Sequence, residues 1–296
     1  MQGWSRSGTD CSDRPGDRPR ISEPRSARKV SVETSQTGNP MDHGLRERAA
    51  LITGASAGLG EAVALSLARE GVRLALAARD AERLSSVAQR STQLGAPQAQ
   101  IFQLDLADPA SIEKMLEGVR GTFGDVDTLI LNGGGPKPGR FSEVALSDWD
   151  SAYWLVLRSM LALVQAFVPD MRSRGWGRIV ALTSTAVKQP IDTLVLSNAF
   201  RAALVAALKT LAGEVARDGV TVNCIATGRV QTARLRALYG NEESKLRDAA
   251  SEVPIGRIAS PDEFAPMVVF LCSEAARYVT GQTISVDGGL VRGLFG

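Results

Sequence analysis

The stretch TGASAGLG, residues 53–60, lies between an apolar run and a helix-like segment. In this pattern Gly54 allows a tight turn off a strand, Gly58 lets the backbone approach a pyrophosphate, and Gly60 permits close packing of the following helix. The start of that helix offers unpaired N–H groups and the positive end of a dipole to phosphates. The pattern therefore favours a dinucleotide-binding loop over a turn with only a structural role.

The chain on both sides of this loop alternates between apolar runs and helix-like segments. The strand candidates are 49–53, 72–78, 99–105, 128–132, 177–184, 220–226 and 283–288. The helix-like segments are 60–71, 111–124, 147–175 and 197–219. Nearly continuous apolar runs are typical of strands that are buried on both faces of a sheet. The alternation predicts an α/β protein with a single-domain Rossmann fold, a doubly wound parallel sheet.

Composition excludes several classes of function. The chain has 296 residues, of which 44% are hydrophobic, and this is enough for the core of one large domain. A net charge of +2 gives no broad basic field for nucleic acid. A single histidine, His43, and three scattered cysteines argue against a metal site. Unpaired cysteines suit a reducing compartment, and no stretch approaches the roughly 20 apolar residues of a membrane span. We expect a cytoplasmic protein that binds neither nucleic acid nor membrane.

The first 40 residues differ in composition from the rest of the chain. They are rich in Arg, Ser, Pro, Gly and Asp and lack the apolar run of a signal peptide. Such a segment cannot bury enough apolar surface to offset the entropy lost on ordering. We predict a disordered extension over 1–45 and a dinucleotide-binding domain over 46–296. The sequence leaves open whether translation begins at Met1 or Met41.

The end of the second strand candidate bears on the choice of cofactor. A protein that prefers NAD usually carries a carboxylate there, which binds the adenosine ribose hydroxyls. Ala78 occupies this place and Arg79 follows it. A guanidinium can pair with a 2′-phosphate. We therefore expect NADP(H), with NAD(H) as the alternative, although Arg79 could also be a solvated residue at a helix start.

These residues, together with later motifs, resemble the short-chain dehydrogenase/reductase family over nearly the whole chain beyond Met41. The later motifs are Leu104-Asp105-Leu106, Leu131-Asn132-Gly133-Gly134, Thr227-Gly228 through Thr232, Tyr278–Gly281 and Ser285–Gly289. The subgroup that the chain resembles most is the β-ketoacyl-acyl-carrier-protein-reductase-like one. The residues expected to bind the cofactor, from the glycine loop and from this resemblance, are Gly54, Ser56, Gly58, Leu59, Gly60, Arg79, Asp105, Leu106, Asn132 and Thr232.

The resemblance also implies a catalytic set, and the chain departs from it. The family uses a helix Asn, a strand-end Ser, and a Tyr followed four residues later by a Lys that lowers the tyrosine pKa. Matching the motifs places Val156 at the Asn, Ser184 at the Ser, Leu194 at the Tyr and Asn198 at the Lys. Leucine cannot donate a proton, and asparagine carries no charge. Ser184 and Asn198 remain as catalytic candidates.

Arg201 could restore the lost cation, because it shares a helix face with Leu194 and Asn198. A salt bridge at a subunit interface explains Arg201 equally well. Two further proton donors are considered, Tyr153 and Lys188, although the first is better explained as a core residue and the second as a solvated one.

Two hypotheses of function follow from the sequence. The first is an NAD(P)-dependent oxidoreductase of a small carbonyl or alcohol substrate, 3-oxoacyl-reductase-like, with an atypical active site. The alternative is a non-redox lyase or isomerase, or a cofactor-binding regulatory protein, on the same scaffold. By resemblance, the chain is expected to form a homodimer or homotetramer without a metal.

Overall fold

The computed structural model describes residues 43–294, and all seven predicted strands are present in it. The strands are β1 (Ala49–Thr53), β2 (Arg73–Ala78), β3 (Ala99–Gln103), β4 (Thr128–Leu131), β5 (Gly177–Leu182), β6 (Val220–Thr227) and β7 (Thr283–Val286). They form one sheet in the order β3-β2-β1-β4-β5-β6-β7, and every neighbouring pair is parallel. The predicted doubly wound parallel fold is confirmed.

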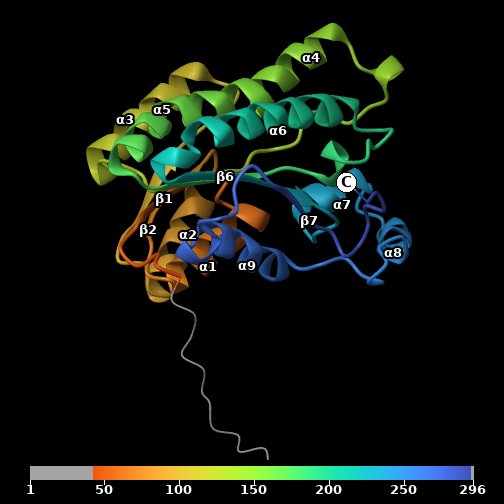
Figure 1. The fold of residues 1–296 in the computed structure, drawn as a ribbon. Helices are drawn as coiled ribbons and strands as arrows, with labels where there is room; N and C mark the ends of the chain where they lie inside the picture. Colours follow the sequence, from red (N-terminus) through yellow and green to blue (C-terminus); the bar gives the residue numbers. More distant parts are fainter. Residues whose placement is uncertain (1–42, 295–296) are drawn as a thin grey trace, which may run out of the picture. The chain divides into compact units, whose positions relative to one another are not determined.

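The helices cover both faces of this sheet. They are α1 (Gly58–Arg69), α2 (Ala81–Gln93), α3 (Pro109–Phe123), α4 (Leu146–Ala152), α5 (Ser159–Arg174), α6 (Val195–Val215), α7 (Ala233–Leu238), α8 (Glu243–Ser251) and α9 (Pro261–Cys272). Figure 1 shows α3, α5 and α6 over one face and α1, α2 and α9 over the other. The crossovers therefore pass on both sides of the sheet, as a doubly wound fold requires.

Strand β1 shows how the two faces are built. All its residues are buried, and they alternate between two hydrophobic clusters. Ala50 and Ile52 pack with residues of α1 and α9, whereas Ala49 and Leu51 pack with residues of α3 and α5. Because successive side chains of a strand point to opposite faces, a continuous apolar run supplies two cores at once.

The domain begins slightly before the predicted boundary at residue 46. Leu45 is 1% exposed and belongs to the core, and the carbonyl of His43 accepts a 2.9 Å hydrogen bond from the backbone N–H of Glu274. His43 also lies 2.9 Å from the carboxylate of Glu70. Residues 43–45 are therefore part of the domain. The disorder predicted for the preceding segment concerns 1–42, which lie outside the described residues.

The helix predicted over 147–175 is interrupted. Between α4 and α5 the chain forms a π-helical turn, η2 (Tyr153–Arg158), a feature that is often found near functional sites. Tyr153 is 40% exposed and packs on Phe200 and Trp154, so its interpretation as a core residue was wrong.

Two helical stretches, Leu146–Arg174 and Val195–Asp218, are long and apolar enough to cross a membrane by length and composition, although we expected none. Both cover the sheet as core helices do: Leu163 of α5 and Leu208 of α6 are buried in the same cluster. Of the most apolar windows of these two stretches, 44% and 28% are buried.

Candidate active site

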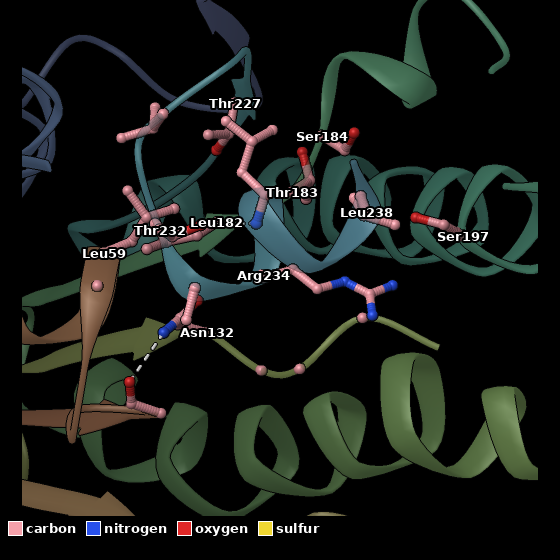
Figure 2. A pocket seen from close by; sticks show the side chains of 18 of the residues that line it. Leu59, Asn132, Leu182, Thr183, Ser184, Ser197, Thr227, Thr232, Arg234 and Leu238 are labelled. Atoms are coloured by element: carbon pink, nitrogen blue, oxygen red, sulfur yellow. Dashed lines mark hydrogen bonds between the residues drawn. The ribbon is translucent and has the colours of Figure 1, made fainter. Parts of the chain in front are cut away.

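A pocket lies at the carboxyl ends of the central strands (Figure 2). Its lining comes from the loops after β1 and β4, the end of β5, the start of α6, and the segment from the end of β6 through α7. Strand order reverses between β1 and β4, because β2 lies on one side of β1 and β4 on the other. Ligands of open α/β sheets bind at this switch point.

The glycine loop forms one wall of the pocket. Gly54 and Gly58 both have φ of +60°, a conformation that favours glycine, and both line the pocket with Leu59. A Cβ at Gly60 would lie 2.2 Å from the carbonyl oxygen of Gly54. Gly60 therefore lets the loop pack closely upon itself, which is a stricter requirement than close packing of the helix. Ser56 is half-buried in the same loop but is not among the lining residues.

Asn132, at the end of β4, holds the glycine loop in place. Its side-chain amide donates a 3.2 Å hydrogen bond to the carbonyl oxygen of Gly54. Its backbone N–H donates to the hydroxyl oxygen of Thr53 at 2.9 Å, and that hydroxyl donates to the Asn132 carbonyl at 2.6 Å. The loops after β1 and β4 are thereby joined into one rigid wall.

Arg79 is exposed at the end of β2 and forms no ion pair with any described residue. The neighbouring carboxylate is engaged elsewhere, because Asp80 caps α2 by accepting a 3.0 Å hydrogen bond from the backbone N–H of Arg83. The Arg79 guanidinium is thus available to an anionic ligand.

The remaining predicted cofactor residues lie around the same edge of the sheet. Asp105 is half-buried and accepts a 3.0 Å hydrogen bond from the backbone N–H of Ala107, while Leu106 is 8% exposed. Neither lines the pocket. Thr232 does line it, caps α7, and has its methyl 3.1 Å from where a Cβ at Gly58 would lie.

The geometry of the pocket fits a bound dinucleotide. The wall of glycines leaves backbone N–H groups without covering side chains, as phosphates require. At the end of β6, the hydroxyl oxygen of Thr227 is buried and has no hydrogen-bond partner among the described residues. A buried hydroxyl without a partner costs free energy. Because Thr227 lines the pocket, a polar ligand group can satisfy it.

Ser184 follows β5 and lines the pocket, as the sequence predicted (Figure 2). Its hydroxyl oxygen accepts a 3.1 Å hydrogen bond from the backbone N–H of Ala186, which fixes the side chain at the start of a short 3₁₀ turn. The hydroxyl proton remains able to donate, because a serine hydroxyl accepts and donates at the same time.

Asn198 is directed away from the pocket. Its amide nitrogen donates to the carbonyl oxygen of Ile191 at 2.9 Å, and its amide oxygen accepts from the backbone N–H of Ile191 at 3.3 Å. These bonds close the loop that precedes α6, and Asn198 is not among the lining residues. The structure thus corrects the sequence-based placement of Asn198 on the catalytic face.

The residues of α6 that line the pocket with Leu194 are Ser197 and Arg201. They are four residues apart, as the family's Tyr and Lys are, so the predicted register was displaced by three residues. One signal was present in the sequence: Arg201 is the only charged residue between Val195 and Leu208. A lone charge in an otherwise uncharged helical stretch points to a polar site.

Arg201 is held firmly within the pocket. Its Nε donates to the hydroxyl oxygen of Ser197 at 3.2 Å, and its Nη1 donates to the carbonyl oxygen of Leu182 at 3.1 Å. Burial, and after it the positive charge of Arg234, lower the pKa of Arg201 to about 10. The site therefore contains a cation whose protonated form is less favoured than that of a solvated arginine.

The other candidate proton donors do not reach the site. Val156, at the position of the family's Asn, is 3% exposed within η2 and is apolar. Tyr153 and Lys188 are both absent from the pocket lining. The polar side chains that line the pocket close to the end of β5 are thus Thr183, whose hydroxyl donates to the carbonyl oxygen of Ile225, and Ser184, Ser197 and Arg201.

A glycine loop at the switch point of a parallel sheet, with a cluster of hydroxyls and a cation beside it, defines a dinucleotide-dependent enzyme of the doubly wound class. Residues 54–291 match the family model described as enoyl-(acyl carrier protein) reductase. The chain belongs to the short-chain dehydrogenase/reductase family, as the sequence motifs predicted.

Several relatives are similar over most of the chain. The 3-oxoacyl-[acyl-carrier-protein] reductase of Escherichia coli (strain K12) is 34% identical over 241 residues, which cover 81% of this chain and 96% of the relative. The crystal structure of L-sorbose reductase from Gluconobacter frateurii, complexed with NADPH and L-sorbose, is 35% identical with a TM-score of 0.80 and covers 86% and 100% of the two chains. An actinorhodin polyketide ketoreductase variant with NADPH is 32% identical with a TM-score of 0.79, covering 83% and 98%.

Proposed function

We propose that the protein is an NADP(H)-dependent oxidoreductase that interconverts a carbonyl and an alcohol on a small-molecule substrate, in the manner of 3-oxoacyl reductases. One observation carries this proposal: a single pocket brings the glycine loop together with Ser184, Ser197 and Arg201. The relatives support it, since those with solved structures include two ketone or sugar reductases with NADPH.

The roles of the side chains follow from the charge that develops during reduction. When bound, the nicotinamide supplies the hydride. Negative charge then grows on the substrate oxygen, where the hydroxyls of Ser184 and Ser197 would donate hydrogen bonds. We propose that Ser197 passes its proton to the alkoxide and regains one from solvent, while the Arg201 guanidinium, whose Nε–H donates to the Ser197 hydroxyl, stays protonated and stabilises the negative charge.

The test is whether the purified protein oxidises NADPH, followed by its absorbance, with a panel of ketones, oxo acids and 3-oxoacyl thioesters. Turnover that falls in Ser184→Ala and in Arg201→Gln supports the proposal. Turnover that persists unchanged in both variants comes from another enzyme or another site and contradicts it. Tight NADPH binding without turnover of any substrate would instead favour a cofactor-binding regulatory protein.

The choice of cofactor gives the first prediction. Arg79 is exposed, has no ion-pair partner among residues 43–294 and follows β2, so we propose that it binds the 2′-phosphate and that NADPH binds more tightly than NADH. Arg79→Ala should weaken NADPH binding about 10- to 100-fold and leave NADH binding nearly unchanged. Fluorescence titration of both nucleotides measures this.

The matched control is Arg83→Ala, because Arg83 is an exposed arginine one turn away that pairs with Asp80. It should leave the ratio of the two affinities unchanged. Equal affinity of the unmutated protein for NADPH and NADH would refute the assignment.

We also propose a homodimer or homotetramer built on the outer face of α4, η2 and α6. Exposed apolar side chains gather in this region: Leu146 is 84%, Phe141 75%, Tyr153 40% and Trp154 39% exposed. Apolar patches of this kind usually mark a protein interface. Light scattering at micromolar concentration should give at least twice the mass of one chain, and Leu146→Asp with Trp154→Asp should reduce it. A monomeric unmutated protein would rule out this interface.

The described cysteines are consistent with a cytoplasmic location, which we propose. Cys224 and Cys272 are both free and buried. Burial raises the pKa of each thiol to about 12, so neither is a reactive thiolate. Unpaired cysteines of this kind are typical of reducing compartments.

A further inference from the structure

Two arginines from different helices converge on the pocket. Arg201 comes from α6 and Arg234 from α7, and both are among the lining residues. Figure 2 shows the Arg234 side chain extending from α7 toward the loop after β4, where its Nη2 donates a 2.7 Å hydrogen bond to the carbonyl oxygen of Pro136. A Cβ at Gly135 would lie 2.7 Å from this same Nη2, so the missing side chain at Gly135 makes room for the guanidinium.

Neither arginine has a carboxylate partner within the described part of the chain. The pocket lining over these residues contains no aspartate or glutamate. The arginines on either side of Arg234 differ in this respect, because Arg229 pairs with Glu252 and Arg236 pairs with Glu243. The absence of a carboxylate is thus particular to the pocket and is not a general feature of this part of the surface.

Arg201 is half-buried and Arg234 is exposed at the rim of the pocket, and their two positive charges repel each other. Burial lowers the pKa of Arg234, and the charge of Arg234 adds to burial in lowering that of Arg201. Hydrogen bonds to the carbonyls of Pro136 and Leu182 fix each guanidinium but neutralise neither. Each guanidinium carries five N–H donors, so donors remain for a ligand. An anion between the two would remove the repulsion and complete their hydrogen bonding.

The residues that we expect to hold the cofactor phosphates lie at the ends of β1 and β2. The glycine loop after β1 presents backbone N–H groups to a pyrophosphate, and Arg79 lies at the end of β2. Arg234 is instead bonded to the loop after β4, and Arg201 is bonded to Ser197, which lines the pocket with Ser184. The arginine pair therefore faces the part of the pocket where the proposed reaction would occur.

We propose that Arg201 and Arg234 form a subsite for an anionic group of the substrate, a carboxylate or a phosphate on an oxo compound. Arg234 is then the residue that selects charged substrates, while Arg201 serves both the anion and the reacting oxygen. The proposal names the substrate class and rests on the proposed function for the reaction. Binding of the anion itself requires no turnover.

Matched pairs of probes that differ in charge test this subsite. Acetoacetate is compared with methyl acetoacetate, and dihydroxyacetone phosphate with dihydroxyacetone, by titration calorimetry of the protein saturated with NADP⁺. At least one charged probe should bind about 10- to 100-fold more tightly than its neutral partner. The pair that shows the difference tells a carboxylate from a phosphate.

Three variants locate the effect. Arg234→Gln should abolish the preference for the charged probe, and Gly135→Ala should weaken it by displacing the guanidinium without removing the charge. Arg236→Gln, which alters an exposed arginine of the same helix, should leave it unchanged. The NADPH affinity without substrate should be the same in Arg234→Gln as in the unmutated protein.

Two outcomes would overturn the proposal. The first is that neither charged probe binds more tightly than its neutral partner, or that the preferred charged probe binds equally well to Arg234→Gln. The second is that Arg234→Gln weakens the binding of NADPH alone by the same factor as the binding of the charged probe. This result would assign Arg234 to the cofactor phosphates. A protein that binds the charged probe through Arg234 but never oxidises NADPH would contradict the proposed function and would still support the anion subsite.

Discussion

Changing Ser197 to tyrosine and Arg201 to lysine together should raise the rate of carbonyl reduction by about 10²–10⁴-fold. The two positions share the pocket-facing side of α6 and have the spacing of the family's Tyr and Lys. A tyrosine with its ordinary pKa of roughly 10 needs a nearby cation to donate and accept protons efficiently at neutral pH. Ser184 is already positioned in the pocket to orient the carbonyl oxygen. NADPH oxidation with the best ketone of the panel measures the gain.

The single variants distinguish this account from a general improvement of the pocket. Arg201→Lys alone should change the rate little, and the gain of the double variant should exceed the sum of the single ones, because the two side chains act as a unit. The matched control is Leu194→Tyr with Asn198→Lys, which makes the same chemical change in the register first expected. It should give no gain, since Asn198 lies outside the pocket. A larger gain from this control would show that the register deduced from the structure is wrong.

Gly60→Ala should weaken NADPH binding at least about 100-fold. The new Cβ would lie 2.2 Å from the carbonyl oxygen of Gly54 and 2.8 Å from Nδ2 of Asn132. Both neighbours belong to the rigid wall that joins the loops after β1 and β4, so neither can move without disrupting the phosphate site. Fluorescence titration measures the affinity, and circular dichroism shows whether the protein stays folded.

Gly213→Ala is the matched control, because Gly213 is also a helical glycine and nothing lies within 4 Å of its added Cβ. It should leave NADPH affinity unchanged and stabilise the protein by about 0.5–1 kcal/mol, the usual difference between alanine and glycine within a helix. If Gly60→Ala binds NADPH as tightly as Gly213→Ala does, the glycine loop does not hold the phosphates in the way proposed here.

The sequence alone determined the architecture and the phosphate side of the pocket. All seven strands lie where apolar runs predicted them, since a strand buried on both faces is mostly apolar, as residues 49–52 of β1 are. The glycines of residues 53–60 could also be identified from the sequence. A positive φ, or a Cβ that would lie near 2 Å from another atom, excludes other residues at these positions. Such constraints act within a few neighbouring residues and can be seen in a linear pattern.

The helices were predicted less completely than the strands. The segments of α2, α7, α8 and α9 were not identified, and the π-helical turn that separates α4 from α5 was not anticipated. The pattern of α2 was present in the sequence, because Asp80 caps this helix and Leu84, Val87 and Ser91 are buried on one face. Short helices such as α7 derive their stability from tertiary contacts and leave a weak local signal.

Only the tertiary structure decided which side of α6 faces the pocket. Leu194, Ser197, Asn198 and Arg201 lie within two turns, and a shift of a few residues in the preceding loop moves each of them to another face. The hydrogen bonds of Asn198 to Ile191 hold its side chain against the preceding loop, and Ser197 and Arg201 line the pocket. Arg201 and Arg234 line the same pocket although they are 33 residues apart in the sequence. This depends on α6 and α7 meeting at one edge of the sheet. No local pattern encodes such a meeting, because it arises from the packing of distant elements.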